Sequence, residues 1–418
     1  MIEELQLINH WLISKDPAYL YKLGIDKSYF FVLGDVVQFI EDFIKQHNQL
    51  PSQELIATEF EDFKKLENLD AVDYLVNVLR EQKAYTEYRP ILTANAQLVS
   101  EGKTIEAMWK MRSDIDKLLK TYTHKMTRYD WVKNALDRYK QYMEKHGKEG
   151  IPGLPTGHSM LDSLTGGWRD DDLILLSGRT NEGKSLVGAY FAFQVWKYVQ
   201  QAKVNAPIIY ITTEMPELEI SYRLDTLKQH FSNTALNQGK LQDPELYREY
   251  LEELSKKDTS FLILSQEANN GKVFTPNDIR AIVESEKPAF MVIDQLYDIS
   301  DGTGERDIRK RIVNATSAIR EINLYTRTPT MLIAQAGREA AKNAKKDPTV
   351  TPELYEIQES DNPAQKATRV ITLRLIDGDL FKLSLKKNRG GRKDVDVFFR
   401  VKIDTGIWEE DTIDTSTF

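Results

Sequence analysis

The chain of 418 residues contains no cysteine and only six histidines. Without cysteine there is no disulfide, no zinc ribbon and no thiol catalysis, and the composition fits a reducing cytosol. The histidines are scattered and form no pair at helical ligand spacing, which argues against a histidine-based metal site. We therefore expect a cytoplasmic protein whose chemistry depends on other side chains.

Long hydrophobic runs are also missing. No stretch approaches the length of a membrane span, and the acidic N-terminus, MIEELQLINHWLISKDPAYL, lacks the apolar run of a signal peptide. The formal net charge is −8, whereas a protein that held nucleic acid over its whole surface would more often be basic. A local basic channel is still compatible with an acidic total, because binding depends on where the charges face.

Strand patterns are nearly absent from residues 1–122. The stretch VLGDVVQFIEDFIKQH places five apolar residues on one helical face, and AVDYLVNVL and TIEAMWKMRSDIDKLLK repeat that period. The five residues are Val36, Val37, Ile40, Phe43 and Ile44. No catalytic constellation is visible, so we predict an all-α N-terminal interaction domain or collar.

Residues 123–154 are predicted to form a linker that contains one amphipathic helix, within MTRYDWVKNALDRYKQYMEKHG. Val132, Leu136, Tyr139 and Met143 recur at i, i+4, i+7 and i+11, which gives a narrow apolar stripe on a charged helix. The stripe needs a surface to cover it. It either folds back on its own chain or docks on a neighbouring subunit.

From residue 155 onward, short β-rich runs alternate with helical stretches. Five continuously apolar runs predict buried strands of a mainly parallel sheet, and three closely spaced amphipathic runs predict an antiparallel meander at one edge. The runs are DLILLSG, PIIYITTE, FLILSQ, AFMVIDQL and PTMLIAQ, then RVITLRL, FKLSLKK and VDVFFRVKI. We therefore predict an α/β domain over residues 155–418, preceded by the all-α domain.

The stretch GRTNEGKS matches the phosphate-loop pattern G-x-x-x-x-G-K-[ST], between a predicted strand and a predicted helix. Glycines let backbone N–H groups turn toward phosphate oxygens, and the helix N-terminus adds positive potential. Lys184 would reach the β- and γ-phosphates of ATP, and the Ser185 hydroxyl would bind Mg²⁺. The predicted nucleotide-binding residues are Gly178, Arg179, Thr180, Asn181, Glu182, Gly183, Lys184 and Ser185.

Three further polar residues are predicted at the carboxyl ends of strands. Asp294 ends AFMVIDQL and would hold Mg²⁺ through water, and Glu214 ends PIIYITTEM and would orient the attacking water. This is the pattern of a RecA-like P-loop ATPase. Gln335 ends PTMLIAQ, where a neutral amide can sense the γ-phosphate and pass the change to the following segment.

Taken together, these stretches resemble the hexameric replicative DNA helicases of the DnaB type over almost the whole chain. IPGLPTGHSMLDSLTGGWRDDDLILLSGRTNEGKS resembles the opening of the family's ATPase domain, TTEMP its Glu-Met motif, VIDQL its magnesium strand and AQAGRE its Gln motif. LYEIQESDNPAQKATRVITL resembles the Glu-Ser segment before the last strands, and LKKNRGG resembles the Lys-x-Arg-x-Gly hairpin. The helical N-terminal region and the linker helix match the family layout.

The resemblance implies a homohexameric ring that encircles single-stranded DNA, moves 5′ to 3′ and unwinds the duplex at a replication fork. It implies that Lys387 and Arg389 reach the γ-phosphate of the adjacent subunit, although Lys386 leaves the register open by one residue. It also implies a primase and a helicase loader as partners. The chain departs from the family at Asn181 and Glu182 in the phosphate loop and at Gln295 in the magnesium strand. The divergent N-terminal domain and the short chain fit a phage or mobile-element member.

A helicase needs phosphate-binding segments near the ring axis, and two predicted loops qualify. DGTGERDIRKRIV follows the magnesium strand, and GREAAKNAKKDP follows the Gln strand. Lys and Arg there can follow a strand's phosphates without reading its bases, although three acids interleave the first segment. The candidate DNA-binding residues are Arg306, Arg309, Lys310, Arg338, Lys345 and Lys346.

Two other functions stay open. The chain can be another RecA-fold ring ATPase, such as a recombination mediator or loader, that binds DNA or protein without unwinding. It can also be a non-enzymatic mimic that only binds ATP. The complete set of Lys184, Glu214, Asp294, Gln335 and Arg389 argues against the mimic, because binding alone does not require all five.

Overall fold

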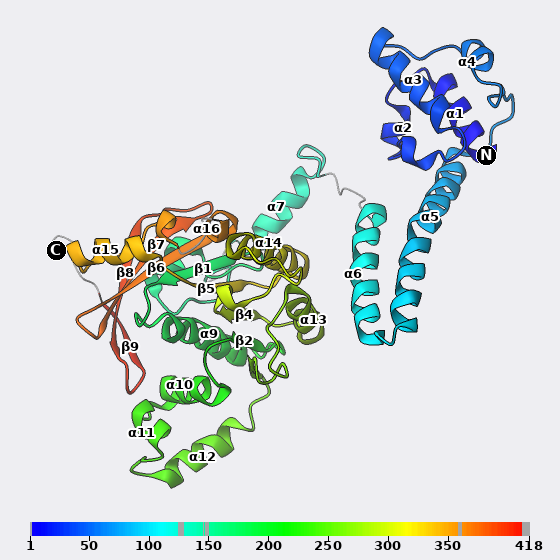
Figure 1. Cartoon of the computed structure of the whole chain (residues 1–418). Coiled ribbons are helices and arrows are strands. Elements are labelled where there is room, and N and C mark those ends of the chain that lie inside the picture. The colour runs from blue at the N-terminus through cyan, green and yellow to red at the C-terminus, as the bar shows by residue number, and fades with distance from the viewer. Residues whose placement is uncertain (1, 124–128, 145, 147–149, 358–361, 412–418) are drawn as a thin grey trace. The chain divides into compact units, whose positions relative to one another are not determined.

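The computed structural model describes residues 2–123, 129–144, 146, 150–357 and 362–411. The chain divides into two compact units, Met1–Tyr139 and Lys140–Phe418, and Figure 1 shows the elements of each. The two units meet inside one helix, so the division into N-terminal domain, linker and ATPase domain that the sequence predicts stays a proposal. Among the described residues, no helix has the length and apolar character needed to cross a membrane.

The first unit is helical, as its sequence period predicts, and no strand occurs in residues 2–123. Its helices are α1 (Ile2–Ser14), α2 (Tyr19–Lys22), α3 (Gly34–His47), α4 (Gln53–Glu59), α5 (Val72–Ser100) and α6 (Thr104–Thr123), with a 3-10 turn at η1 (Lys27–Tyr29). Val36, Val37 and Ile40 of α3 are buried in the core of this unit. Phe43 and Ile44 are half-buried at its rim.

The predicted linker helix is shorter than its sequence pattern suggests. Helix α7 covers Ala135–Met143, whereas residues 126–128, 145 and 147 of the predicted helix lie outside the described part of the chain. Val132 lies before α7, and the other three stripe residues lie on it. All four are exposed, from 44% at Met143 to 75% at Leu136. An apolar stripe of this kind is available for a partner surface.

The second unit is built on a nine-stranded sheet of order β3-β2-β4-β5-β1-β6-β7-β8-β9. The strands are β1 (Leu173–Gly178), β2 (Ile208–Thr212), β3 (Phe261–Ser265), β4 (Phe290–Asp294), β5 (Thr330–Gln335), β6 (Arg369–Ile376), β7 (Leu380–Asn388), β8 (Val395–Lys402) and β9 (Ile407–Asp411). Neighbours from β3 to β6 are parallel, and those from β6 to β9 are antiparallel. The fold is therefore the predicted RecA-like α/β sheet with an antiparallel C-terminal edge.

The sheet corrects three details of the sequence-based prediction. RVITLRL forms β6, which pairs in parallel with β1 as well as antiparallel with β7, so it joins the two parts of the sheet. FLILSQ forms β3, which is half-buried except at Ser265 because it lies at the sheet edge, with β2 as its one neighbour. The ninth strand, β9, was not predicted, because its sequence IWEED is largely charged.

Helices cover both faces of this sheet (Figure 1). Helix α9 packs on one face through Val187 and Phe191, and α13 and α14 pack on the other through Ile279 and Ile319. The helices of this unit are α8 (Ser159–Thr165), α9 (Lys184–Gln201), α10 (Glu217–Gln229), α11 (Asn233–Gln238), α12 (Pro244–Leu254), α13 (Pro276–Glu286), α14 (Ile308–Thr326), α15 (Arg338–Lys346) and α16 (Asn362–Lys366), with 3-10 turns at η2 (Leu296–Asp298) and η3 (Leu354–Glu356). Strand residues alternate between the two cores, which explains the continuously apolar runs.

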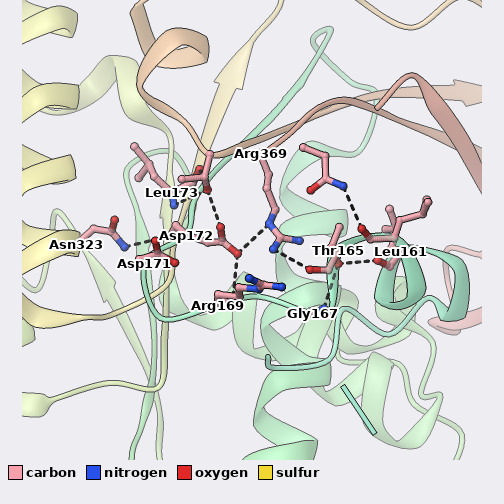
Figure 2. A network of polar contacts seen from close by, with 12 residues as sticks. Leu161, Thr165, Gly167, Arg169, Asp171, Asp172, Leu173, Asn323 and Arg369 are labelled. Carbon is pink, nitrogen blue, oxygen red and sulfur yellow. Dashed lines mark hydrogen bonds and ion pairs between the residues drawn. The ribbon is translucent and has the colours of Figure 1, made fainter. Parts of the chain in front are cut away.

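A buried polar network joins the amino ends of β1 and β6 (Figure 2). Arg369 Nε lies 2.9 Å from Asp172 Oδ2, and the two side chains are only 3% and 6% exposed. Thr368 donates its hydroxyl to the other Asp172 oxygen, and Arg369 also donates to the carbonyl of Thr165. Asn323 of α14 donates to the carbonyl of Asp172. The network fixes the end of the sheet that lies away from the phosphate loop.

Candidate active site

The phosphate loop connects β1 to α9 in a conformation that its sequence favours. Asn181 and Gly183 both have positive φ, 63° and 83°, and α9 begins directly afterwards at Lys184. A Cβ on Gly183 would lie 2.7 Å from the Phe381 ring, so only glycine fits there. The first backbone N–H groups of α9 have no intrahelical partner and are available to an anion.

The polar residues predicted at the ends of strands meet at the carboxyl edge of the sheet. Glu214, Asp294 and Gln335, from the ends of β2, β4 and β5, line one cavity of about 660 Å³ together with Lys184 and Ser185. The parallel register explains the meeting, because Thr212 is level with Asp294 and Gly178 is level with Gln335. Lys184 donates to the Arg179 carbonyl at 3.0 Å. Burial lowers the pKa of Lys184, and the nearby Asp294 and Glu214 oppose that shift.

Asp294 and Ser185 provide oxygen ligands that suit Mg²⁺. Asp294 is 4% exposed and accepts a 2.7 Å hydrogen bond from the Tyr210 hydroxyl. Burial raises the pKa of Asp294, while hydrogen bonds from Ser185 and Tyr210 and the charge of Lys184 oppose that rise. No group of three or more acidic or histidine side chains that could hold a metal occurs among the described residues. Mg²⁺ at a phosphate site needs only one or two protein ligands, so the residues fit.

Glu214 lines the cavity and is oriented by Gln295, the residue that follows β4. Gln295 Nε2 donates to Glu214 Oε1 at 2.6 Å, which gives a role to the residue that departs from the family pattern. Burial raises the pKa of Glu214, and the negative charges of Asp294 and Asp298 raise it further. A carboxylate with a raised pKa, held at the end of a strand, is suited to accept a proton from water.

Part of the cavity wall is formed by residues that the sequence motifs do not predict. Leu375, Phe381 and Ile403 provide apolar walls from β6, β7 and the β8–β9 turn. Arg223 of α10 also lines the cavity, and its charge lowers the pKa of Asp294. The one signal for Arg223 in the sequence is its position on the helix that follows Glu214.

Two phosphate-loop residues turn away from the cavity. Glu182 is buried and forms an ion pair with Arg374 of β6, so its carboxylate does not line the cavity. Arg179 donates through its guanidinium to the carbonyl of Gly337 at 3.1 Å. Thr180 and Asn181 line the cavity itself.

Comparison with known proteins gives this arrangement a family. The model of the DnaB-like helicase C-terminal domain matches residues 153–404, which is more than half of the chain. The chain belongs to the DnaB-like helicases.

Curated relatives are replicative helicases of low sequence identity. A probable replicative DNA helicase of Trieres chinensis is 22% identical over 345 residues, which cover 80% of this chain and 72% of that protein. The replicative DNA helicase DnaB of Geobacillus stearothermophilus is 22% identical over 318 residues, which cover 72% of this chain and 65% of that protein.

Solved structures share the fold. A structure described as a DnaB-like replicative helicase and its interactions with primase has a TM-score of 0.68 at 14% identity and covers 98% of this chain and 99% of its own. A second structure, of an ATPase domain alone, has a TM-score of 0.57 at 16% identity and covers 67% of this chain and 98% of its own. The first comparison covers the helical unit as well as the ATPase unit.

In this DnaB-like chain, the Lys-x-Arg hairpin lies at the opposite end of the sheet from the phosphate loop. Arg389 follows Asn388, which is level with Arg369 at the amino end of β6, whereas Phe381 at the start of β7 lines the nucleotide cavity. The Lys387 ammonium donates to the carbonyls of Ala364 and Gln365, and burial lowers its pKa.

The two lysines before Arg389 have different surroundings. Lys386 forms an ion pair with Glu353 of its own chain, and Lys387 holds the end of α16 through backbone carbonyls. Arg389 itself is exposed. Both lysines thus have partners within their own chain, whereas the side chain of Arg389 is open to solvent.

The candidate DNA-binding residues lie mostly on helices, not on the loops that the sequence predicted. Arg309 and Lys310 are in the first turn of α14, capped by Asp307, and only Arg306 stays in the preceding loop; all three basic residues are exposed. The second segment is helix α15, on which Lys345 and Lys346 are exposed. Arg338 begins this helix, but its side chain is outside the described part of the structure.

Local hydrogen bonds occupy the acids of the first segment. Asp307 accepts from the backbone N–H groups of Arg309 and Lys310, and Glu305 accepts from the N–H of Asp307. Asp301 binds Thr303 and Asn314. These acids are therefore engaged in shaping the turn, and the basic side chains beside them are left to solvent.

Proposed function

We propose that this chain is a replicative DNA helicase that couples ATP hydrolysis to movement along single-stranded DNA. The observation that carries the proposal is the cavity that joins the phosphate loop to Glu214, Asp294 and Gln335. Family membership favours a helicase over a RecA-fold ring that binds without unwinding.

The chemistry follows from the positions of the side chains around the cavity. Lys184 and the N-terminus of α9 bind the phosphates, and Glu214, held by Gln295, orients a water and accepts its proton. Mg²⁺, held by Ser185 and Asp294, would neutralise charge on the phosphate oxygens. Gln335 would sense the γ-phosphate from the end of β5.

The position of Arg389 supports an active site shared between subunits. Strand β6 has eight residues and therefore spans about 23 Å at the usual rise per residue, so Arg389 lies at the wrong end of the sheet to reach its own phosphate loop. We propose that Lys387 and Arg389 serve the neighbouring subunit of a homohexameric ring. A guanidinium supplied by a neighbour stabilises charge that develops on the transferred phosphoryl group.

The exposed basic residues of α14 and α15, with Arg306 beside them, are the proposed contacts to the DNA backbone. Phosphate contacts of this kind are independent of sequence and depend on salt. We further propose movement in the 5′ to 3′ direction, and a primase and a loader as partners. The primase proposal is supported by the similar solved structure, which is described as a DnaB-like replicative helicase with its primase interactions.

Unwinding of forked duplexes that carry only one free tail tests this function. We expect ATP-dependent unwinding with a free 5′ tail and none with a free 3′ tail alone, since the ring must load on the strand along which it moves. ATP hydrolysis stimulated by single strands without unwinding of either fork would favour the alternative ring ATPase.

A further inference from the structure

The phosphate loop is linked by two arginines to the segment that carries α15. Arg179 donates to the carbonyl of Gly337, which is the residue that caps the start of α15. Arg374 donates through Nε to the carbonyl of Pro348, one residue beyond the Asp347 cap at the end of α15, at 2.9 Å. The loop that would hold the nucleotide is thus linked to both ends of the segment that carries Lys345 and Lys346, directly at its start and through Arg374 at its end.

The second link depends on a charge pair across the sheet edge. Glu182 accepts the backbone N–H of Arg179 with one carboxylate oxygen at 3.1 Å, and its other oxygen pairs with the Arg374 guanidinium. Both side chains are largely buried, 11% exposed for Glu182 and 18% for Arg374. Arg374 therefore holds a phosphate-loop carboxylate and the Pro348 carbonyl at the same time, which needs the fork of donors that only arginine has.

We infer that Arg374, through Glu182, is a positioning residue that couples nucleotide binding to the basic helix α15. Any shift of the phosphate loop as a triphosphate enters moves Glu182, and Arg374 carries that displacement to the chain after α15. The inference rests on the proposed function, because it assumes that α15 contacts the strand. By linkage, a strand bound at α15 then changes nucleotide affinity by the same factor that the nucleotide changes strand affinity.

Three variants separate the effect of the Glu182 charge on nucleotide affinity from the coupling between nucleotide and strand. Arg374→Ala leaves the Glu182 carboxylate buried and unpaired within the phosphate loop, so nucleotide should bind less tightly. Adding Glu182→Gln to Arg374→Ala removes that charge and should restore nucleotide affinity. Arg374→Lys keeps the positive charge but loses the fork. We expect it to bind nucleotide normally with its coupling reduced.

The measurement is the affinity of the full-length chain for a fluorescent, non-hydrolysable ATP analogue, with and without oligo(dT). In the wild-type chain, the ratio of the two affinities should differ from one by roughly fivefold or more. Arg374→Lys should keep the affinity of the DNA-free protein but bring the ratio closer to one, because only the Arg179 link to α15 then remains. The double variant should show the same reduced ratio. Arg400→Ala on β8, which breaks ion pairs with Asp379 in the β6–β7 turn and with Asp411 of β9, is the matched control and should keep the wild-type ratio.

The outcomes distinguish this inference from the proposed function. A wild-type ratio in both Arg374→Lys and the double variant would overturn the inference, because the coupling would then not pass through the fork of Arg374. A wild-type chain that binds the analogue with no effect of oligo(dT) would overturn it too. A wild-type chain that does not bind the analogue at all would instead contradict the proposed ATPase.

Discussion

At the scale of single residues, substitutions of Glu214 and Lys184 distinguish ATP hydrolysis from ATP binding. Glu214→Gln keeps the shape of the side chain but removes the proton acceptor, so we expect ATP to bind and hydrolysis to slow by roughly 10²- to 10⁴-fold. Lys184→Ala should weaken nucleotide binding itself. Steady-state hydrolysis and equilibrium binding of ATP measure the two effects.

The exposed Glu219→Gln on α10 serves as the control for both variants, because it changes the same residue type on the helix after Glu214. It should leave both binding and turnover unchanged. Near-normal turnover in Glu214→Gln would show that another group is the base.

The raised pKa of Glu214 predicts the acid limb of the pH–rate profile, which is the pH range in which ATP hydrolysis is lost as the pH falls. Glu214 must be ionised to accept a proton, so activity should be lost as the pH falls through a pKa that lies above the usual glutamate value. Asp298 contributes to that rise, and Asp298→Asn keeps the shape that receives the Thr213 hydroxyl at 2.9 Å. We expect the acid limb of kcat in Asp298→Asn to move to lower pH. An unchanged limb would mean that a different group controls it.

The candidate site shows which residues could be predicted from the sequence. Glu214, Asp294 and Gln335 end apolar runs, and parallel strands bring such ends to one edge, so local sequence was sufficient. Arg223 and Arg374 were missed because their roles depend on how a helix and a distant strand fold toward the loop. For the same reason, the sequence left open whether Glu182 faces the triphosphate.

At the scale of secondary-structure elements, the strands differ in how clearly the sequence predicts them. Strands β1, β4 and β5 are central and covered on both faces, so their runs are continuously apolar. Strand β9 pairs with β8 alone, and its charged side chains carry no such signal. The sequence predicts loops for the basic segments because lysine and arginine are common in both loops and exposed helices, so composition alone does not distinguish the two.

The basic residues of α14 and α15 predict how DNA binding depends on salt. Replacing Arg306 and Arg309, or Lys345 and Lys346, with alanine should weaken binding to any single strand. The slope of log affinity against log salt should fall by roughly one unit for each phosphate that is no longer neutralised. The matched control is Lys256→Ala with Lys257→Ala, an exposed pair just after α12. If the salt slope of these variants equals that of the control, the replaced residues do not contact DNA phosphates.

The network at the amino ends of β1 and β6 predicts a large loss of stability. Arg369→Met leaves Asp172 buried without its cation, which typically costs about 3–5 kcal/mol. Replacing both partners, with Arg369→Met and Asp172→Leu, should cost less, because no charge is then left unpaired. Urea unfolding, monitored by tryptophan fluorescence, measures the free energy of unfolding of each variant. Trp168 reports on this region because it lies against the Arg369 guanidinium. Equal losses of unfolding free energy in the single and double variants would show that the unpaired Asp172 charge is not the cause.

At the scale of the whole molecule, mixing two inactive variants tests whether the active site is shared. Arg389→Ala should bind ATP but hydrolyse it poorly, by on the order of a thousandfold or more, and Lys184→Ala should be inactive. After exchange of subunits, some junctions would pair an intact phosphate loop with an intact arginine, and ATP hydrolysis should return to a fraction of the wild-type rate. Unwinding need not return, because it requires several junctions to act in turn.

Subunit exchange must be demonstrated independently, for example with two fluorescent labels. A tandem fusion of one variant of each kind guarantees a mixed junction. If the fusion stays inactive, Arg389 does not act on the neighbouring subunit.

The separation of the phosphate loop from Arg389 by the length of the sheet also bears on how such a protein can evolve. One gene encodes both surfaces that would meet at each junction, so a substitution at one surface is repeated around the whole assembly at once. A substitution near Arg389 is kept only if the surface around Arg389 still fits the phosphate-loop surface of the neighbouring copy. We therefore expect residues that are distant within one chain to covary among relatives. Mixed assemblies of diverged relatives should then lose activity at the boundaries between unlike copies, even when each parent is active alone.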